Sequence, residues 1–305
     1  MSDSDRLPRE LDDYWLERRL AVGGMSELYR ASRVRSDGVR EQLVLKLLLP
    51  HLCDQSEVRE LFANEARITR WCSHPNVVRA LDSGVAEGRP YLALELLSGT
   101  DLGEVASLHR SRLCPVPWRT VVCIAAAACA GLHHAHELSL DGRPLNLVHR
   151  DVSPSNLMIC TDGLVKLLDF GLARADGLVD PVQVGAALGV PAYTAPEQFW
   201  GVPLDRRADI FSLGVILHEL LTGRRLFWRG SEAATMLAVV EGAIPTPSSI
   251  REDLPGGLDA VLARALDRDR EGRYSSAVEL QQALLAFAPS DAASIANLAR
   301  AAVDA

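Results

Sequence analysis

The chain has 305 residues, of which 48% are hydrophobic and 24% charged, so it can bury a large core as one domain or two packed lobes. This composition excludes a disordered protein. The formal net charge of −8 argues against a nucleic-acid partner, because phosphate backbones are held by clustered Lys and Arg.

The cysteines, the N-terminal residues and the most apolar segments indicate in which cellular compartment the protein is expected. No two of the six cysteines form a Cys-x-x-Cys pair, which predicts reduced thiols, no disulfide and no zinc site. Residues 1–13 form a polar extension without the basic-then-apolar order of a secretion signal. The most apolar segments, 121–132 and 210–221, fall short of the roughly 20 residues that span a bilayer. We therefore expect a cytoplasmic protein that does not insert into a membrane.

The first hundred residues are typical of strands separated by Gly, Asp and Pro turn residues. The expected strands are 15–20, 28–34, 42–49, 77–83 and 91–96. Between the third and fourth of these, apolar residues recur at three-to-four spacing over 56–72. This spacing predicts one helix that crosses the sheet.

After Gly99 the pattern becomes mostly helical. The clearest helical runs are 120–138, 208–222, 232–241, 258–266 and 276–287. Two short strand-like pieces, 157–160 and 165–168, interrupt them, and the Ala-rich segment 284–305 is expected to form a terminal helix. A small sheet-rich half followed by a larger helical half predicts a two-lobed α+β fold.

Several motifs follow one another along the chain. Val44-Leu45-Lys46 ends in a lysine on a predicted strand, and Glu65 lies on the helix that follows. In the second half, His149-Arg150-Asp151 precedes Asn156 by five residues, counted from the aspartate. Asp169-Phe170-Gly171 comes directly after a strand-like run.

Ala195-Pro196-Glu197 completes this series. Together the motifs resemble those of protein kinases, and most closely the eukaryotic-like (Hanks-type) Ser/Thr kinases of bacteria, over about residues 14–287. Five motifs in the family's order are far more specific than any one of them alone.

The resemblance implies a protein-kinase-like fold and an ATP- and Mg²⁺-dependent transfer of the γ-phosphoryl group to a protein hydroxyl. It implies an N-lobe and hinge over 14–97, built from a small antiparallel sheet with one helix. A larger helical C-lobe would follow over 98–287, and then a tail over 288–305. The expected partner is a protein substrate or signalling partner.

The same resemblance implies the catalytic roles. Asp151 would accept the substrate hydroxyl proton, and Asn156 and Asp169 would hold Mg²⁺. Lys46 would orient the ATP phosphates, and Glu65 would fix the direction of Lys46.

The implied nucleotide contacts lie in four places. The backbone of Glu95 and Leu97 would meet the adenine edge beside Leu94 as gatekeeper, and Asp101 would accept a ribose hydroxyl. The other expected contacts are an apolar sandwich from Leu20, Leu28, Val44 and Met158, and a phosphate-cradling loop with Ala21, Gly23, Gly24 and Ser26.

The chain departs from the family's pattern at four positions. Ala21 and Ser26 replace the outer glycines of the phosphate loop, where a Cβ hinders close approach of the backbone. Ser153 replaces the Lys two residues after the catalytic aspartate, and Val190 replaces the Thr that bonds this Lys. We expect weaker ATP binding and slow turnover.

Residues 171–190 contain no Ser, Thr or Tyr, so no phosphate can be added there to recruit Arg150. We therefore predict an activity that does not depend on phosphorylation of this segment. Two alternatives remain for Arg150. Either Asp176 or Asp180 serves as a fixed carboxylate, or both are solvated loop charges, and the usual behaviour of loop acids favours the second.

Other functions compete with an active protein kinase. A pseudokinase, acting as a nucleotide-binding or partner-binding scaffold, is the main alternative, because of the four departures. A small-molecule kinase of related fold is disfavoured by Ala195-Pro196-Glu197, which in the family builds a platform for peptide substrates. Scaffold roles are expected for Asp209, which would anchor the catalytic loop, and for Arg273, which would pair with Glu197.

Overall fold

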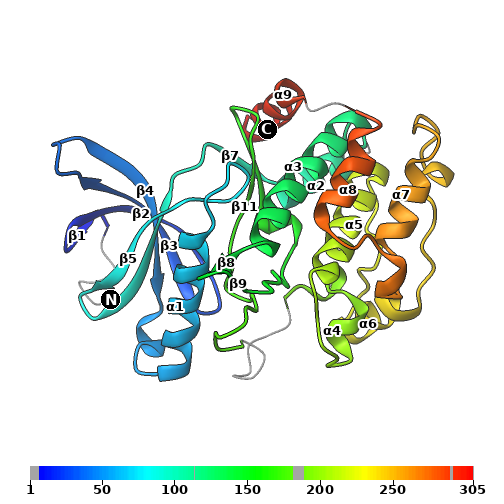
Figure 1. Cartoon of the computed structure of the whole chain (residues 1–305). Helices are drawn as coiled ribbons and strands as arrows, with labels where there is room; N and C mark the ends of the chain where they lie inside the picture. Colours follow the sequence, from blue (N-terminus) through cyan, green and yellow to red (C-terminus); the bar gives the residue numbers. More distant parts are fainter. Residues whose placement is uncertain (1–6, 113, 181–188, 289–290, 305) are drawn as a thin grey trace. The chain divides into compact units, whose positions relative to one another are not determined.

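The computed structural model describes residues 7–112, 114–180, 189–288 and 291–304. The chain divides into two compact units, shown in Figure 1. The first comprises 1–73 and 78–97, and the second comprises 74–77 and 98–305. Each unit contains its own secondary structure, as the composition and motif order predict for two lobes.

The first unit is built on an antiparallel sheet with the strand order β1-β2-β3-β4-β6-β5. Its strands are β1 (Arg9–Leu11), β2 (Tyr14–Val22), β3 (Ser26–Val34), β4 (Arg40–Leu48), β5 (Ala80–Ala86) and β6 (Arg89–Glu95). The predicted strands are present, and β1 is an additional one. It pairs with β2 and buries Leu11 completely, so part of the predicted polar extension contributes to the sheet.

The predicted bounds of β5, residues 77–83, were wrong, because the strand begins at Ala80 and ends at Ala86. Val77 is instead buried and forms a parallel bridge with Leu167 of the second unit's small sheet, so His74–Val77 belong to that unit. The apolar residues Val77 and Val78 look like the start of a strand in sequence. They are nevertheless buried in different units, Val77 in the second and Val78 in the first.

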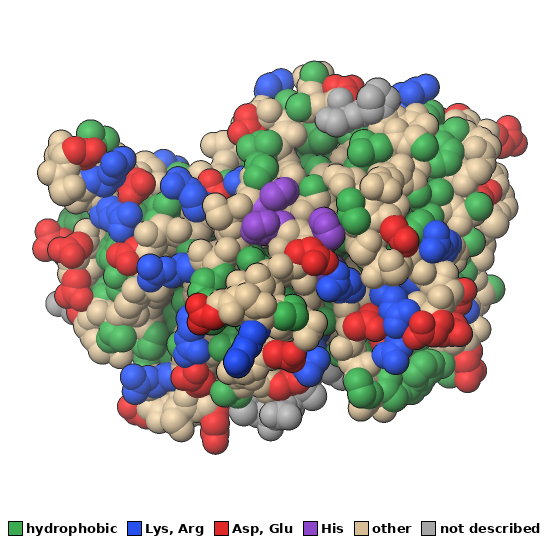
Figure 2. All heavy atoms as spheres, viewed as in Figure 1, with side chains coloured by type: hydrophobic (Ala, Val, Ile, Leu, Met, Phe, Trp, Pro, Cys, Tyr) green, Lys and Arg blue, Asp and Glu red, His purple; other side chains and the backbone are tan. Residues whose placement is uncertain are grey.

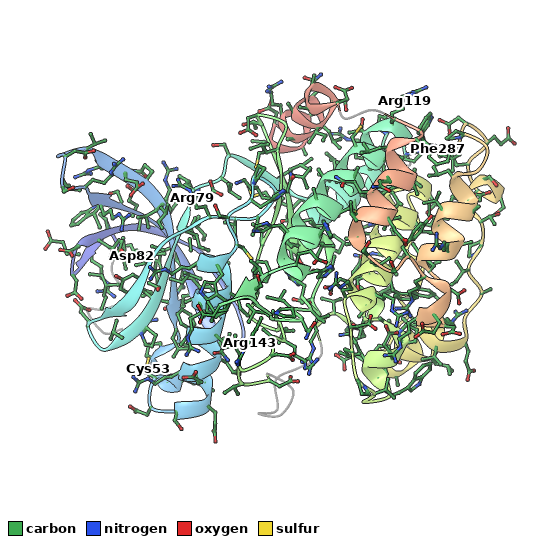
Figure 3. All side chains as sticks on the ribbon, viewed as in Figure 1. Cys53, Arg79, Asp82, Arg119, Arg143 and Phe287 are labelled. Carbon is green, nitrogen blue, oxygen red and sulfur yellow. The ribbon has the colours of Figure 1, made fainter. Side chains whose placement is uncertain are left out.

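The predicted helix is present as α1 (Ser56–Trp71), which packs beside β5 and β6. Its residues Phe62 and Ala66 form a buried cluster with Leu48 and Leu92. The other face of the sheet has its own apolar core, which includes Leu16, Leu43, Leu45, Leu47 and Tyr29. Asp82, labelled in Figure 3, accepts hydrogen bonds from Tyr14, Arg33 and Tyr91 at one end of this core.

The second unit is mainly helical. Its helices are α2 (Leu102–Ser111), α3 (Trp118–His136), α4 (Pro196–Phe199), α5 (Arg207–Thr222), α6 (Glu232–Glu241), α7 (Leu258–Ala265), α8 (Ala277–Leu285) and α9 (Ala292–Val303). Helix α3 packs against α5 and α8, and α7 packs against both α5 and α8, as Figure 1 shows. Helix α5 is buried from Ala208 to Thr222, which explains why its sequence is apolar around the whole circumference.

Two small sheets accompany these helices. One has the order β11-β10-β7, with β7 (Gly99–Asp101), β10 (Leu157–Cys160) and β11 (Val165–Leu167), and the other pairs β8 (Ser139–Leu140) with β9 (Arg143–Pro144). Short 3₁₀ turns are η2 (Pro50–Leu52), η3 (Pro154–Asn156), η5 (Pro191–Tyr193), η6 (Pro247–Ser249) and η7 (Arg270–Gly272). The strand-like pieces predicted around residues 157 and 165 are confirmed. Helix α9 packs on β7 and β10 and buries Ile295, Ala296 and Ala299.

Helix α2 was not among the predicted helices. It follows Gly99-Thr100-Asp101, whose residue types signal a turn, and Asp101 caps its N-terminus by accepting from the Glu104 amide. Its apolar face is short: Leu102, Val105 and Ala106 are buried. Ten residues with so narrow an apolar face give a weak periodic signal.

The surface carries both signs of charge. Figure 2 shows Asp and Glu side chains interspersed with Lys and Arg side chains on the face viewed. Within the described ranges, no helix combines the length and the apolar composition that crossing a bilayer requires.

Candidate active site

Lys46 and Glu65 form a buried ion pair in the first unit. Lys46 on β4 is 5% exposed and Glu65 on α1 is 2% exposed, and Lys46 Nζ lies 2.5 Å from Glu65 Oε1. Such a pair resists removal of one partner, because the remaining charge would stay desolvated. The pair can hold an ammonium group in a fixed direction, as phosphate orientation requires.

The strand register places further predicted nucleotide contacts on the same face of the sheet as Lys46. Leu28 on β3 is directly opposite Lys46, and Ala21 on β2 is opposite Leu28. Val44 lies two residues before Lys46 and is paired with Leu94 on β6. Because side chains alternate across a strand and directly paired residues share a face, these residues form one surface.

The predicted phosphate loop is the turn between β2 and β3. Gly23 N donates to Ser26 O at 2.8 Å, and Ser26 is buried, whereas Leu20 and Ala21 are exposed. A Cβ on Gly24 would meet no atom within 4 Å, and one on Gly23 would make only ordinary contact with Ser26 O. The fold itself therefore does not require these two glycines, which is consistent with a role in admitting a ligand close to the backbone.

The predicted hinge lies at the end of β6. Glu95 N donates to Arg79 O at 3.0 Å, and the Glu95 carboxylate accepts from Arg79 N at 2.8 Å. Leu94, the expected gatekeeper, packs against the apolar cluster of α1 described above. Leu97 is half-buried and ends the first unit.

Asp151 and Asn156 are joined in the second unit. Asn156 Nδ2 donates to Asp151 Oδ2 at 2.8 Å and to the Asp151 carbonyl at 2.9 Å. Burial raises the pKa of Asp151, and the nearby charge of Asp169 raises it further, against opposing effects of His149 and the Asn156 hydrogen bond. A fixed carboxylate with a raised pKa suits a general base.

Asp169 is placed by its neighbours and by its backbone. It has a left-handed backbone with φ of 53°, and its Oδ1 accepts from Gly171 N at 2.9 Å. His149 Nε2 donates to Leu168 O at 3.0 Å, and the His149 ring packs against Phe170 at 4.9 Å. These contacts fix the Asp-Phe-Gly turn to the catalytic loop.

Asn156 and Asp169 fit a magnesium ion. Leu168 N donates to Asn156 O at 2.9 Å, which brings the two predicted ligands to the same end of the small sheet. The Asn156 amide nitrogen is used on Asp151, so its oxygen is the atom left to face a cation. Mg²⁺ prefers oxygen ligands and commonly takes one or two from protein with phosphates completing its shell.

Two further predicted contacts lie on the second unit's small sheet. Met158 on β10 is directly opposite Asp101 on β7, so the two residues share one face of this sheet. Asp101 is only half-buried, although one of its carboxylate oxygens caps α2.

Asp209 anchors the catalytic loop, as predicted. It is fully buried at the start of α5 and accepts from the backbone amides of His149 at 2.8 Å and Arg150 at 2.9 Å. His136 Nε2 lies 2.8 Å from the same carboxylate. Burial alone would raise the pKa of Asp209, but His136 and the amide donors hold it below its ordinary value.

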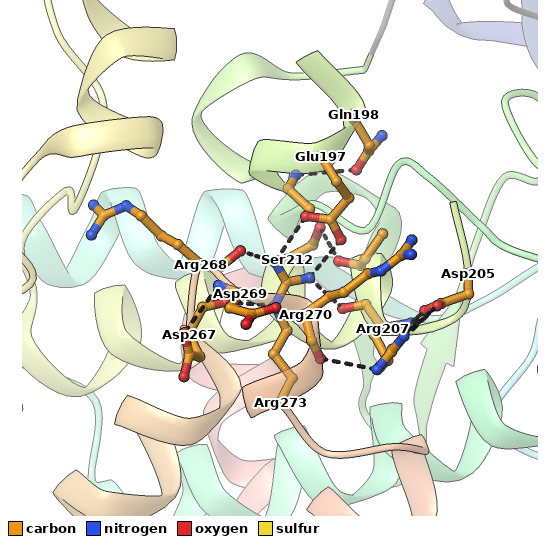
Figure 4. Close-up of polar contacts among 12 residues, drawn as sticks. Glu197, Gln198, Asp205, Arg207, Ser212, Asp267, Arg268, Asp269, Arg270 and Arg273 are labelled. Carbon is orange, nitrogen blue, oxygen red and sulfur yellow. Dashed lines mark hydrogen bonds and ion pairs between the residues drawn. The ribbon is translucent and has the colours of Figure 1, made fainter. Parts of the chain in front are cut away.

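The predicted pair of Glu197 and Arg273 is confirmed and is shown in Figure 4. Two parallel hydrogen bonds of 2.6 and 2.8 Å join the guanidinium to the carboxylate, and both side chains are buried. Arg273 also donates to the carbonyls of Asp267 and Arg207, so each polar group is satisfied. Next to Glu197, Gln198 Nε2 donates to Arg150 O at 3.3 Å and ties α4 to the catalytic loop.

For Arg150, the interpretation that both loop acids are solvated was wrong. Arg150 donates two hydrogen bonds to Asp180, at 2.5 and 3.0 Å, and the Asp180 side chain is only 19% exposed. Asp176, in contrast, is exposed and accepts from Asn146. Asp180 is therefore the fixed carboxylate, because it is largely buried and bonds Arg150 in bidentate geometry instead of being solvated.

Gly189 was not singled out from the sequence. Its φ is +52°, and a Cβ there would lie 2.6 Å from Asp151 Oδ1. The backbone amide of the next residue, Val190, hydrogen-bonds Asp151. Because residue 189 has no side chain, the backbone can approach Asp151. The Val190 amide then takes the place of the missing Thr hydroxyl as a hydrogen-bond donor to this carboxylate. Ser153 is buried and bonds to Ser155 at 3.0 Å.

Comparison with known proteins agrees with this geometry. A family model described as "Protein kinase domain" matches residues 14–298. The chain is 41% identical over 275 residues to "Tyrosine-protein kinase MasK" of Myxococcus xanthus and 36% identical over 283 residues to "Serine/threonine-protein kinase PknH" of Mycobacterium tuberculosis. These matches cover 90% and 92% of this chain but 43% of each relative, so the chain spans less than half of either.

A solved structure is also similar. The crystal structure of the Mycobacterium tuberculosis PknI kinase domain has a TM-score of 0.66 and 26% identity, and covers 92% of this chain and 98% of that one. The first unit corresponds to a kinase N-lobe with a curled antiparallel sheet, and the second to a helical C-lobe. The chain belongs to the protein kinase domain family.

Proposed function

We propose that this domain transfers the γ-phosphoryl group of ATP to a Ser or Thr hydroxyl of a protein substrate. The observation that carries the proposal is Asp151, whose carboxylate is held by Asn156 and by the Val190 amide and whose pKa is raised beside Asp169. All the residue types that the reaction needs are present, and the ion pair of Lys46 with Glu65 is formed.

In the proposed reaction, Asp151 accepts the proton of the attacking hydroxyl as its oxygen bonds to the γ-phosphorus. The bond between that phosphorus and the β-γ bridging oxygen breaks, and ADP leaves. Lys46 would orient the α- and β-phosphates, while Asn156 and Asp169 would hold Mg²⁺. When bound, Mg²⁺ neutralises charge on the phosphate oxygens.

The nucleotide would be bound by the residues predicted from the sequence. The shared sheet face of Ala21, Leu28, Val44 and Lys46 supports this, as does the pairing of Met158 with Asp101. The remaining proposed contacts are Leu20, Gly23, Gly24, Ser26, Glu95 and Leu97. Because ATP is supplied in the cytoplasm, we propose that the domain acts there on a protein partner.

The class of hydroxyl needs a direct test, because relatives of both kinds match. PknH is named a serine/threonine kinase and MasK a tyrosine kinase. The experiment is phosphoamino-acid analysis after incubation of the purified chain with labelled ATP, Mg²⁺ and casein. Phosphoserine or phosphothreonine that is lost in Asp151→Asn supports the proposal.

Phosphotyrosine alone would refute the hydroxyl class while leaving phosphoryl transfer intact. Label that is equal in the wild-type chain and in Asp151→Asn would favour a scaffold without turnover. Asp176→Asn is the matched control, because Asp176 is an exposed aspartate of the same unit.

A further inference from the structure

Glu219 on α5 lies at the centre of a polar network that the proposed reaction does not use. Its side chain is 2% exposed, and its two carboxylate oxygens accept from the Leu226 amide at 2.9 Å and from the Tyr193 hydroxyl at 2.8 Å. Arg225 donates to the same hydroxyl at 2.7 Å, whereas its guanidinium lies 3.9 Å from the carboxylate. The Tyr193 hydroxyl therefore joins a buried acid to an arginine whose side chain is 40% exposed.

This network is linked to Asp151, the proposed base, by a short stretch of backbone. The Val190 amide hydrogen-bonds Asp151, and Val190 O accepts from Tyr193 N at 2.9 Å across the 3₁₀ turn η5. Three residues of such a turn advance only about 6 Å. In an extended substrate, a residue four positions from the accepting hydroxyl lies about 13 Å away from it. Substrate residues that flank the hydroxyl can therefore reach Tyr193 and Arg225.

A second arginine, Arg110 in the last turn of α2, approaches the same network. Burial lowers the pKa of Arg110, and the nearby charge of Arg225 lowers it further, while Glu219 and Tyr193 act in the opposite direction. Within the described part of the chain, the Arg110 side chain makes no hydrogen bond and no ion pair. The two guanidinium groups repel each other, so an anion that lies near both of them is stabilised.

Glu219 does not neutralise this pair of arginines. Its oxygens already accept hydrogen bonds from Leu226 and Tyr193, and burial raises its pKa against the opposing effects of those donors and of the arginines. The segment that joins α5 to α6, residues 223–230, contains three arginines and no acidic residue, although the whole chain has a net charge of −8. Positive charge therefore exceeds negative charge beside the Tyr193 hydroxyl.

We propose that Arg110 and Arg225 bind an acidic side chain of the protein substrate, within four residues of the hydroxyl that is phosphorylated. This specificity rests on the proposed phosphoryl transfer and adds a substrate class to it. A substrate carboxylate accepts charge-assisted hydrogen bonds from the guanidinium groups, which fix its direction. A Lys at the same substrate position would add a third positive charge, so the domain selects against it.

The test is a positional peptide library with a central Ser or Thr, incubated with the full chain, labelled ATP and Mg²⁺. Each of the four positions on either side is fixed in turn as Glu or as Lys, and the remaining positions are degenerate. For the wild-type chain we expect at least one position at which Glu gives at least about tenfold more transfer than Lys, because attraction and repulsion add.

Substitutions of Arg110 locate the site, because its side chain has no partner within the described residues whose loss would disturb the fold. Arg110→Gln should weaken the preference for Glu at that position at least about threefold, and Arg110→Glu should remove it. The control is Arg119→Glu, an exposed arginine of the same unit that is labelled in Figure 3. It should keep the preference within about twofold of the wild type.

Thermal unfolding checks that each variant is folded, and the comparison of Glu with Lys in the wild-type chain needs no variant. Transfer to the library without a preference for Glu at any position overturns this proposal and leaves the proposed function intact. An unchanged preference in Arg110→Glu overturns it as well, because the acidic residue would then be recognised elsewhere.

Casein serves as the reference substrate in the same experiment. Transfer to casein but to no library peptide also overturns the specificity, since recognition would then need contacts beyond the four flanking residues. No transfer to casein or to the library contradicts the proposed function itself, and the specificity fails with it.

Discussion

Asp180 gives Arg150 a carboxylate partner next to Asp151, the proposed catalytic base. Arg150 has a left-handed backbone with φ of 67°, and its side chain is only 7% exposed, so its buried charge requires a partner. Arg174 also approaches Asp180, at 3.7 Å. Asp180 thus supplies a carboxylate to Arg150 in a segment, 171–190, that has no hydroxyl to accept a phosphate.

We therefore expect Asp180→Asn to lower the rate of phosphoryl transfer about tenfold, since a charge-assisted bond of about 1.5–3 kcal/mol is lost. Asp176→Asn should leave the rate within about twofold, because Asp176 is exposed. Initial rates with labelled ATP measure both variants. Equal rates for the two would contradict a role for Asp180, and a loss of rate after phosphatase treatment would contradict independence from phosphorylation.

Gly189 makes the second residue-level prediction. In Gly189→Ala the new Cβ would meet Asp151 Oδ1 at 2.6 Å in a left-handed backbone. Gly177→Ala is a matched control, because Gly177 has φ of +81° and nothing within 4 Å of an added Cβ. Both should lose about 1–2 kcal/mol of stability in chemical unfolding from backbone strain. Only Gly189→Ala should also lower the transfer rate, by about tenfold or more.

The raised pKa of Asp151 predicts how the rate depends on pH. As a base, Asp151 must be ionised, and a raised pKa keeps it protonated to higher pH than the ordinary 3.8 of an aspartate. The transfer rate should therefore fall as pH falls through a value above 3.8. The measurement is kcat from about pH 4 to 8, with circular dichroism to verify folding. A rate that stays constant down to pH 4 would contradict this assignment.

At the scale of elements, α1 makes different contacts on different sides. One side holds Glu65 against Lys46, and another lines a cavity of about 770 Å³ between α1, β5 and β6. One side of the helix is apolar and packs in the cluster with Leu48 and Leu92. The side that lines the cavity carries alanines and arginines instead.

Substitutions in the ion pair of Lys46 with Glu65 can separate effects on stability from effects on activity. Glu65→Ala should lower the free energy of unfolding by about 3–5 kcal/mol in chemical unfolding, because it removes the buried carboxylate that bonds Lys46. The double variant Lys46→Met/Glu65→Leu should recover most of that free energy and yet have no transfer activity. A double variant as unstable as Glu65→Ala would show that packing, rather than charge, dominates at this site.

At the scale of the whole molecule, residue types in a fixed order predicted the fold and most scaffold contacts. Glu197 with Arg273 is an example, since both positions were identified from their motifs and then found in bidentate contact. Contacts without a motif were less predictable. Asp180 looks like any loop acid in sequence, and its burial depends on a long-range approach to Arg150.

The sequence also gave little indication of unusual backbone conformations, or of which of the two units a short segment belongs to. The left-handed φ of Gly189 has no periodic signature, and only the position of Asp151 gives it meaning. The start of β5 was misplaced because Val77 and Val78 look alike in sequence, although Val77 pairs with Leu167. Short elements such as β1 and α2 bury too few residues to produce a clear pattern.

The most direct test of the whole account is the rate of phosphoryl transfer by the full chain with saturating ATP and Mg²⁺, compared between the wild type and Asp151→Asn. We predict measurable turnover by the wild-type chain and a loss of at least about 10²-fold in the variant, since a positioned general base contributes roughly 10²–10⁴-fold. No turnover by the folded wild-type chain, or the same rate in both, would contradict it.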